Sequence, residues 1–290
     1  MATRIVYSLL YILSLLPLGA LYALSDIFFL INFYGAGYRR EIIRSNLQHA
    51  FPEKDREALR RTEKQFYRHF ANLMAETVKL VSMSAGSLLE RVKLVENEDF
   101  KHLANTPKTA IVLTAHYGNW EWGGMALDLH MQKKTMAAYK VQRSAIADNL
   151  MHRLRSRFGI EPVPMKLILR RLLREQDTAP IGIFIADQTS TQGEAGLWME
   201  FMHREVPFFA GPESMARRFD LPVYMLFIHR RKRGRYEIRV ELISDNSNEM
   251  REGDIMKMYI RKLENALRQQ PPFWLWSHRR WKHADRRVIF

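Results

Sequence analysis

An uncharged apolar stretch occupies the N-terminus of the chain. From Ile5 to Leu24, serine and tyrosine are the only polar side chains. In a helix that rises 1.5 Å per residue, these residues span about 30 Å, the thickness of the hydrocarbon core of a bilayer. A second apolar stretch, Ile27–Phe33, follows Ser25-Asp26. The pattern predicts an N-terminal membrane helix, with the second stretch crossing the bilayer or lying along it.

The N-terminal stretch has two alternative interpretations. A signal peptide starting at Arg4 would have a shorter apolar segment and a clear cleavage site, whereas this run is long and lacks one. A buried core helix is the other alternative. The flanking charges favour a membrane helix, because basic residues crowd its downstream side at Arg39, Arg40 and Arg44. The positive-inside tendency then predicts a membrane anchor over residues 1–32 and a cytoplasmic domain over residues 33–290.

Helical and strand-like patterns alternate along the rest of the chain. Apolar residues at helical spacing predict two helices, Tyr38–Ala50 and Glu53–Met83, separated at Phe51-Pro52. Beyond Gly86, β-branched runs predict strands at Ala110–Thr114, Ile181–Ala186, Val223–Ile228 and Tyr236–Ile243. Helical patterns separate or follow them at Trp120–Gln132, Ile146–Phe158, Leu167–Glu175, Glu213–Phe219 and Asp254–Gln269. This alternation predicts an α/β domain, with a mainly parallel mixed sheet flanked by helices.

Composition narrows the class of protein further. The 290 residues include 45 Lys+Arg and 31 Asp+Glu, a net charge of +14, and 47% are hydrophobic, which is typical of a folded basic protein. The charge predicts an anionic partner: nucleic acid, a membrane surface, or an acidic protein or lipid. Zero cysteines exclude a disulfide scaffold, a thiolate metal site and a cysteine nucleophile.

The turn after the first predicted strand holds candidate catalytic residues. His116 stands at the carboxyl end of the strand, Gly118-Asn119 can turn the chain, and Asn119 suits the N-cap of the next helix. Across such a junction, Glu121 can accept a hydrogen bond from one ring nitrogen of His116 and leave the other nitrogen as a general base. A structural histidine near a helix-terminal carboxylate is the alternative that spacing alone leaves open.

Five blocks in a fixed order carry a resemblance that covers the whole chain. They are Tyr38-Arg39-Arg40 with Asn46-Leu47 and Phe51-Pro52-Glu53; His116–Glu121; Tyr139 and Arg143 with Arg153-x-Arg155; Asp187-Gln188; and Trp276-Ser277-His278-Arg279-Arg280-Trp281-Lys282. Together they resemble the lipid A biosynthesis acyltransferase family, the lauroyl/myristoyl transferases. His116–Glu121 stands in the place of the family's H-x₄-D/E catalytic motif.

The resemblance implies a glycerolipid acyltransferase-like fold and a membrane-bound enzyme at the cytoplasmic face of the bacterial inner membrane. Such an enzyme moves a fatty acyl chain from an acyl carrier protein or coenzyme A thioester to a hydroxyl of a lipid A precursor. His116 would remove the proton from that hydroxyl, and Glu121 would stabilise the imidazolium. No metal, cofactor or acyl-enzyme is expected. Backbone amides near Gly118, or an arginine, are the candidate donors to the oxyanion.

Further residues are candidates for substrate contact. Asp187 and Gln188 follow a predicted strand, where Asp187 can orient a head group or cap a loop. Arg279 and Arg280 suit phosphate, because a guanidinium matches it in bidentate geometry. Asn119, Arg143 and Glu213 complete the predicted set, although solvation explains Arg143 and helix capping explains Glu213 equally well.

Other functions stay open at the level of sequence. The same motif serves acylation of a lysophospholipid, an aminolipid or a glycosylated phosphoinositide. A non-enzymatic basic membrane scaffold is a further alternative, and it requires His116 and Glu121 to be far apart. The basic run Arg230–Arg235 predicts an exposed hairpin loop that contacts anionic lipid or an acidic carrier protein. Nucleic acid is not expected, since no nucleic-acid-binding motif is recognisable.

Overall fold

The N-terminal stretch folds as two helices rather than one in the computed structural model, which describes residues 2–189, 196–282 and 284. Helix α1 spans Ala2–Ser14 and α2 spans Leu18–Leu30, which continues as a π-helical segment, η1, over Ile31–Ala36. The break falls at Pro17, because proline has no N–H for a helix and disfavours helical backbone in the preceding residue. The continuous helix expected over Ile5–Leu24 is therefore wrong in its bounds. Leu18–Ala36 is the described helix long and apolar enough to cross a membrane.

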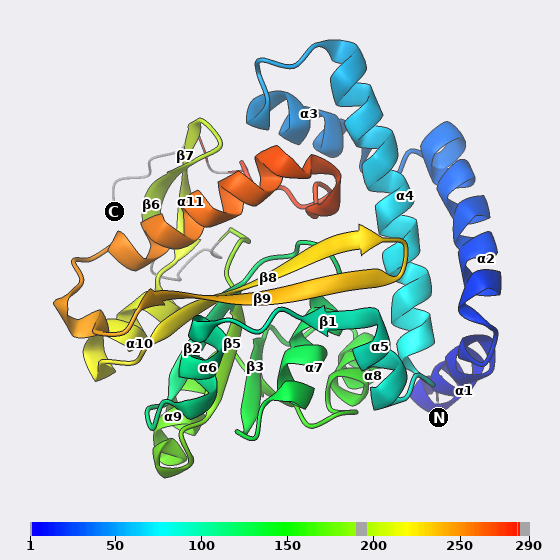
Figure 1. The fold of residues 1–290 in the computed structure, drawn as a ribbon. Coiled ribbons are helices and arrows are strands. Elements are labelled where there is room, and N and C mark those ends of the chain that lie inside the picture. Colours follow the sequence, from blue (N-terminus) through cyan, green and yellow to red (C-terminus); the bar gives the residue numbers. More distant parts are fainter. Residues whose placement is uncertain (1, 190–195, 283, 285–290) are drawn as a thin grey trace.

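A helical hairpin connects this region to the sheet. Helix α3 spans Arg40–Ala50 and α4 spans Arg56–Leu80, which confirms both predicted helices to within a few residues. The side chain of Asp55 caps α4 by accepting a hydrogen bond from the backbone N–H of Ala58 at 2.7 Å. Helix α2 lies along α4 on its outer side (Figure 1). Through α4, the apolar N-terminal helices are joined to the body of the protein.

A seven-stranded sheet in the order β1-β9-β8-β2-β5-β3-β4 forms the centre of the molecule. Neighbouring strands pair in parallel, apart from the antiparallel β8–β9 hairpin. The strands are β1 (Val92–Leu94), β2 (Ala110–Thr114), β3 (Thr135–Tyr139), β4 (Glu161–Pro164), β5 (Ile181–Ile185), β8 (Val223–Lys232) and β9 (Arg235–Ser244). The predicted α/β class and mainly parallel sheet are confirmed.

Helices flank both faces of this sheet. They are α5 (Ala85–Arg91), α6 (Glu98–Asn105), α7 (Trp120–His130), α8 (Ala145–Arg155), α9 (Ile168–Arg174), α10 (Gly211–Phe219) and α11 (Asp254–Gln269), with short 3₁₀ segments at Gln176–Thr178, Ser247–Glu249 and Pro271–Phe273. All five helices predicted beyond Gly86 are present. Each shows an apolar face at helical spacing, and that face packs on the sheet.

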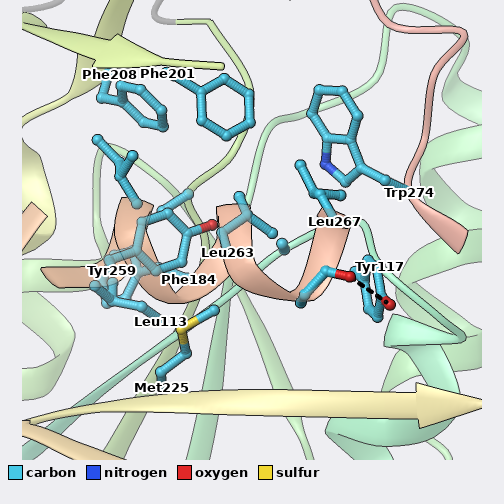
Figure 2. Close-up of a cluster of buried hydrophobic side chains, with 14 of the residues drawn as sticks. Leu113, Tyr117, Phe184, Phe201, Phe208, Met225, Tyr259, Leu263, Leu267 and Trp274 are labelled. Carbon is cyan, nitrogen blue, oxygen red and sulfur yellow. Dashed lines mark hydrogen bonds between the residues drawn. The ribbon is translucent and has the colours of Figure 1, made fainter. Parts of the chain in front are cut away.

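Alternating side chains of the strands supply two separate hydrophobic cores. On β2, Ile111 and Leu113 belong to one core, whereas Ala110 and Val112 belong to the other. The first core lies beneath α11, where Tyr259 and Leu263 project toward the sheet and toward a second hairpin (Figure 2). Burial on both faces explains why β2 reads as a continuous apolar run rather than an alternating one.

That second hairpin consists of β6 (Gly196–Phe201) and β7 (Arg204–Phe209). Its Phe201 ring stacks on Trp281 at 5.8 Å and contacts Trp274 edge to face at 5.7 Å. The C-terminal motif therefore packs its tryptophans into the core, between the hairpin and α3. This packing encloses the sheet edge at which β2 and β5 end.

Two arginines of the basic run form ion pairs within the molecule. Residues Arg230–Lys232 belong to β8, and the chain turns at Arg233-Gly234, so most of the predicted loop is strand. Arg231 pairs with Glu237 at 2.6 Å, and Arg233 pairs with Asp26 of α2 at 2.8 Å. Gly234 has a φ of +65°, which this two-residue turn requires. Arg233 thus attaches α2 to the hairpin, while Arg231, Lys232 and Arg235 are exposed, as predicted.

Candidate active site

The register of the sheet brings His116 and Asp187 together. Strands β2 and β5 are parallel neighbours in which Thr114 pairs with Ile185, and each chain continues for two residues to His116 and Asp187. Both side chains therefore leave the same carboxyl edge of the sheet, the edge at which α/β proteins bind ligands.

Asp187 holds both the ring and the backbone of His116. Its Oδ1 lies 2.7 Å from Nδ1 of His116, and its Oδ2 accepts the backbone N–H of His116 at 3.0 Å. The indole N–H of Trp274 donates to the same Oδ2 at 2.7 Å. The carboxylate is almost fully buried, while the His116 side chain keeps 17% of its surface exposed. The imidazole is thus fixed on one side and open on the other.

The surroundings of Asp187 favour its charged form. Burial by itself raises the pKa of this carboxyl, but the charge of His116 and the hydrogen bonds from His116 and Trp274 outweigh burial and bring the pKa below its usual value. A carboxylate that accepts the proton on Nδ1 fixes the tautomer and leaves Nε2 with a lone pair. The pair therefore has the geometry of a histidine base and the carboxylate that orients it.

Gln188 and Trp120 border the open side of the imidazole. The amide nitrogen of Gln188 lies 3.2 Å from Nε2 of His116, and the Trp120 ring contacts the imidazole edge to face at 5.0 Å. Three of the predicted residues, His116, Asp187 and Gln188, are therefore in direct contact.

Glu121 is bound to an arginine. Its carboxylate accepts two hydrogen bonds from Arg155 of α8, at 2.9 Å and 2.5 Å, in a bidentate ion pair. The charge of Glu121 outweighs the effect of burial on Arg155 and raises its pKa. Within the described residues, no hydrogen bond joins Glu121 to His116. The structure thus gives His116 a different carboxylate partner from the one that the His-x₄-Glu spacing suggested.

A narrow, largely apolar slot adjoins this ion pair, between α7 and the sheet. It encloses about 40 Å³, and its lining includes Trp120, Glu121, Arg155, Gly124, Ala137, Ala138 and Ile183. Gly124 is buried, yet a Cβ atom at this position would have no neighbour within 4 Å. The slot therefore extends from the Trp120 side of His116 along the face of α7, with a buried glycine on its wall.

Helix α4 supports the turn from beneath. A ring nitrogen of His69 lies 3.2 Å from the carbonyl oxygen of Gly118, and burial lowers the pKa of His69 to about 3, so the ring is neutral. Asn119 caps α7 by accepting the backbone N–H of Trp122 at 3.0 Å, as predicted. Its amide donates to Glu76, also on α4, at 2.6 Å. Both hydrogen-bonding ends of Asn119 are therefore used inside the protein.

The remaining predicted residues lie apart from the turn. Arg143 is exposed. Both carboxylate oxygens of Glu213 accept backbone N–H groups at the start of α11, from Gly253 and Met256, which assigns Glu213 to capping. Burial raises the pKa of Glu213, and those two N–H groups offset part of the rise. Both oxygens of Glu213 are thus engaged within the protein, and no substrate contact is needed to explain this residue.

The two arginines of the C-terminal motif differ in environment. Arg279 is exposed and lines a surface hollow of about 370 Å³. Arg280 is fully buried, donates to the carbonyl of Pro207 at 3.1 Å, and stacks over the Phe208 ring at 4.0 Å. Burial lowers the pKa of Arg280 to about 10. Its contacts attach the C-terminal motif to the β6–β7 hairpin.

One expected oxyanion donor is already engaged. The backbone N–H of Gly118 donates to the carbonyl of Phe273 at 2.9 Å. A Cβ at Gly118 would lie 2.4 Å from the carbonyl oxygen of Ile228, so only glycine fits this close approach. Gly118 therefore shapes the turn, and its amide is not free for a substrate.

Sequence reasoning left several residues of the site unassigned. Arg155 stands inside one of the quoted blocks and Trp274 lies two residues before another, and these positions were their only signal. His69 and Glu76 lie mid-helix on α4 without any local motif. Among residues 2–189, 196–282 and 284, no group of three or more His, Asp and Glu side chains could hold a metal ion.

Comparison with known proteins assigns the chain to a class of enzymes. The model of the bacterial lipid A biosynthesis acyltransferase family matches residues 2–283, almost the whole chain. No curated protein matches it. The chain is therefore an acyltransferase, and it belongs to the bacterial lipid A biosynthesis acyltransferase family.

Proposed function

We propose that the protein moves a fatty acyl chain from a thioester to a hydroxyl of a lipid A precursor, with His116 as general base and Asp187 as the carboxylate that orients it. The observation that carries the proposal is the 2.7 Å contact between Nδ1 of His116 and Asp187, at the ligand-binding edge of the sheet. Family membership supplies the reaction class, and this contact supplies the residues.

The chemistry follows from the tautomer that Asp187 imposes. With the proton on Nδ1, the Nε2 lone pair of His116 accepts the proton of the acceptor hydroxyl, which takes the place of the Gln188 amide. The hydroxyl oxygen forms the ester bond as the carbon–sulfur bond breaks, and the proton passes to the leaving thiolate. Asp187 stabilises the imidazolium that exists between these steps. The chain contains no cysteine, so no thioester forms on the protein.

Glu121 has a different role from Asp187 in this proposal. Its ion pair with Arg155 stands on the wall of the slot, one residue from Trp120, which contacts His116. A partly buried ion pair keeps its geometry when both partners are fully hydrogen bonded. We therefore assign Glu121 and Arg155 to shaping the entrance of the slot.

The N-terminal helices serve as the membrane anchor in the same proposal, over residues 1–32, with the body of the protein on the cytoplasmic side of the inner membrane. Their outward surface is apolar, because large hydrophobic side chains remain exposed at Ile5, Leu9, Ile12, Leu15, Leu16, Leu24, Ile27, Phe28, Leu30 and Ile31. An exposed apolar patch of this kind is typical of a membrane or protein contact. The anionic acceptor then reaches the site from the bilayer, and the donor, acyl carrier protein or coenzyme A thioester, reaches it from the cytoplasm.

The slot beside α7 is the proposed site of the acyl chain. At about 40 Å³ it is tight, and the chain enters by parting its walls, which small residues at Gly124, Ala137 and Ala138 make easier. Replacement Gly124→Leu fills this space with four carbon atoms. Each methylene excluded from an apolar site forfeits about 0.8 kcal/mol, so the loss of two methylenes shifts the preference about tenfold toward shorter donors. The measurement is kcat/KM for a series of donors of increasing chain length.

Gly86→Leu is the matched control for this series. Gly86 lies on an exposed helix, α5, and a Cβ there also meets nothing within 4 Å. The control variant keeps the wild-type chain-length preference. An unchanged preference in Gly124→Leu would place the acyl chain elsewhere.

Purified protein tests the proposed function itself. Membranes or micelles containing the protein are incubated with a lipid A precursor and either acyl carrier protein or coenzyme A thioesters. Mass spectrometry then records the mass of the acceptor. The expected product carries one additional acyl chain in ester linkage. If a lysophospholipid or an aminolipid gains the mass of an acyl chain and the lipid A precursor does not, that lipid is the acceptor instead.

A further inference from the structure

One buried carboxylate, Glu76 of α4, joins three distant parts of the chain. It is fully buried and accepts hydrogen bonds from the Tyr22 hydroxyl and the Tyr236 hydroxyl, each at 2.7 Å, and from the Asn119 amide at 2.6 Å. These three donors belong to α2, to β9 and to the turn that carries His116. No step of the proposed reaction uses Glu76, so its role needs a separate explanation.

Burying this carboxyl is costly unless its hydrogen bonds are complete. Burial raises the pKa of Glu76, while the bonds from Tyr236, Tyr22 and Asn119 act in the opposite direction. Removing one acceptor would strand buried donors, at a cost of about 1–3 kcal/mol each. The three bonds are therefore coupled, and a shift of the Tyr22 hydroxyl is felt by the Asn119 amide through a shared partner.

The Tyr22 end of this network is held firmly on the tip of the β8–β9 hairpin. Arg233 donates to both carboxylate oxygens of Asp26 at 2.9 Å and 2.8 Å, and to the carbonyl of Tyr22 at 3.1 Å. A Cβ at Gly234 would lie 2.2 Å from the Tyr22 hydroxyl oxygen, so the hairpin tip approaches α2 as closely as glycine allows. The seating of α2 therefore fixes where the Tyr22 hydroxyl meets Glu76.

The Asn119 end lies three residues from the proposed base. Asn119 Oδ1 accepts the N–H of Trp122 and its amide is held by Glu76, which fixes the residue at both ends. A displacement here moves the start of α7 and, with it, Trp120 and Glu121, which border the imidazole and the slot. Misplacing a reacting group by about 1 Å can cost about 100-fold in rate.

We infer that Glu76 is a positioning residue through which α2, by way of Tyr22, sets the geometry of the turn that carries His116. The inference rests on the proposed function, since it takes that turn as the catalytic one. Its consequence is that the seating of the apolar N-terminal helix is communicated to the reacting groups. Helix α2 then contributes to the chemical step as well as to attachment.

Three variants test this inference in the acyl-transfer assay. Glu76→Leu lowers kcat about 10- to 100-fold, because it disturbs the turn that carries His116 and the start of α7. Glu76→Gln keeps kcat within about threefold, since the Tyr22 hydroxyl can rotate to accept the new amide N–H. Tyr22→Phe removes one donor only and lowers kcat about threefold to tenfold. Should Glu76→Leu not fold, Tyr22→Phe and Glu76→Gln carry the test.

The combination of variants separates positioning from stability. Tyr22→Phe causes no further loss of kcat in the Glu76→Leu background, because both act through one path. Tyr34→Phe is the matched control: it removes a hydroxyl from an exposed tyrosine in η1, the continuation of α2, and kcat stays unchanged. All rates are measured per folded molecule, well below the melting temperature.

Two results would overturn the inference: a wild-type kcat in folded Tyr22→Phe, or an equal effect of Tyr22→Phe with and without Glu76. His116→Ala in the same assay separates the two claims. If His116→Ala is active, His116 is not the base and the proposed function fails. If His116→Ala is inactive and Tyr22→Phe has a wild-type kcat, only the role of Glu76 is disproved.

Discussion

Replacement of His116 by alanine removes acyl transfer while the protein remains folded and membrane-bound. A positioned general base contributes roughly 10²–10⁴-fold, and the rate falls by at least that factor. His116 belongs to neither hydrophobic core, and the buried Asp187 keeps its hydrogen bonds from the backbone N–H of residue 116 and from the Trp274 indole, so the fold is retained with a lower melting temperature. The measurement is the initial rate of transfer to the lipid A precursor, with the amount of protein in the membrane fraction as the control.

Gln188→Ala makes a useful comparison for His116→Ala. Gln188 contacts the same imidazole but holds no proton in the proposed reaction, so this variant retains most of its activity. A His116→Ala variant with wild-type rates would mean that another group accepts the proton of the hydroxyl.

Asp187→Asn causes the second large loss, roughly 10³–10⁴-fold in kcat, by changing the tautomer of His116. In the wild type, Oδ2 accepts two N–H groups and Oδ1 accepts the Nδ1 proton. The asparagine oxygen satisfies the two N–H groups, from His116 and Trp274, and its amide then faces Nδ1. That arrangement places the imidazole proton on Nε2, where the base needs a lone pair.

Glu121→Gln is the matched variant for Asp187→Asn, because it makes the same chemical change in the other candidate carboxylate. Glu121 is bonded to Arg155, so its replacement weakens that ion pair and leaves the tautomer of His116 as it is. The expected order is a larger loss of kcat in Asp187→Asn than in Glu121→Gln. The reverse order would return the orienting role to Glu121, as the His-x₄-Glu spacing suggested.

Two of the strands that sequence predicted, β2 and β5, are buried on both faces, whereas the predicted β9 alternates between buried and more exposed residues. Strands β2 and β5 read as β-branched runs because each side chain meets a core. Strand β4 lies at an edge of the sheet and contains Pro162 and Pro164. Sheets tolerate proline mainly in edge strands, because it has no N–H to donate. With these prolines, the β4 segment gave no strand signal in the sequence. The β6–β7 hairpin was also missed, because its two strands contain no β-branched run. Sequence therefore predicted the centre of the sheet and missed its margins.

The site was predictable as a set of residues but not as a set of bonds. His116 and Asp187 each stand two residues past a strand, which a reader of the sequence can see. Their pairing depends on β2 and β5 being neighbours in the sheet, and the local sequence pattern does not predict strand order. Likewise Glu121 meets Arg155 of α8, 34 residues later in the chain, because the fold brings the ends of α7 and α8 together. The carboxylates of the site were found, and their partners required the fold.

The apolar N-terminal segment shows how one residue decides a boundary. The apolar run continues through Pro17, so composition alone indicates a single span from Ile5 to Leu24. Proline ends the first helix and shifts the candidate span to Leu18–Ala36. That shift places Asp26 in the same helix as Tyr22, which packs along α4, where the two residues meet Arg233 and Glu76.

The most direct test of the central claim is the mass of lipid A from cells in which this chain is replaced by its His116→Ala form. Membranes must contain the variant at the wild-type amount. The account predicts lipid A that lacks one acyl chain, restored in full by the wild-type protein. Lipid A of unchanged mass, with the variant present and no other enzyme acylating the same position, would contradict it.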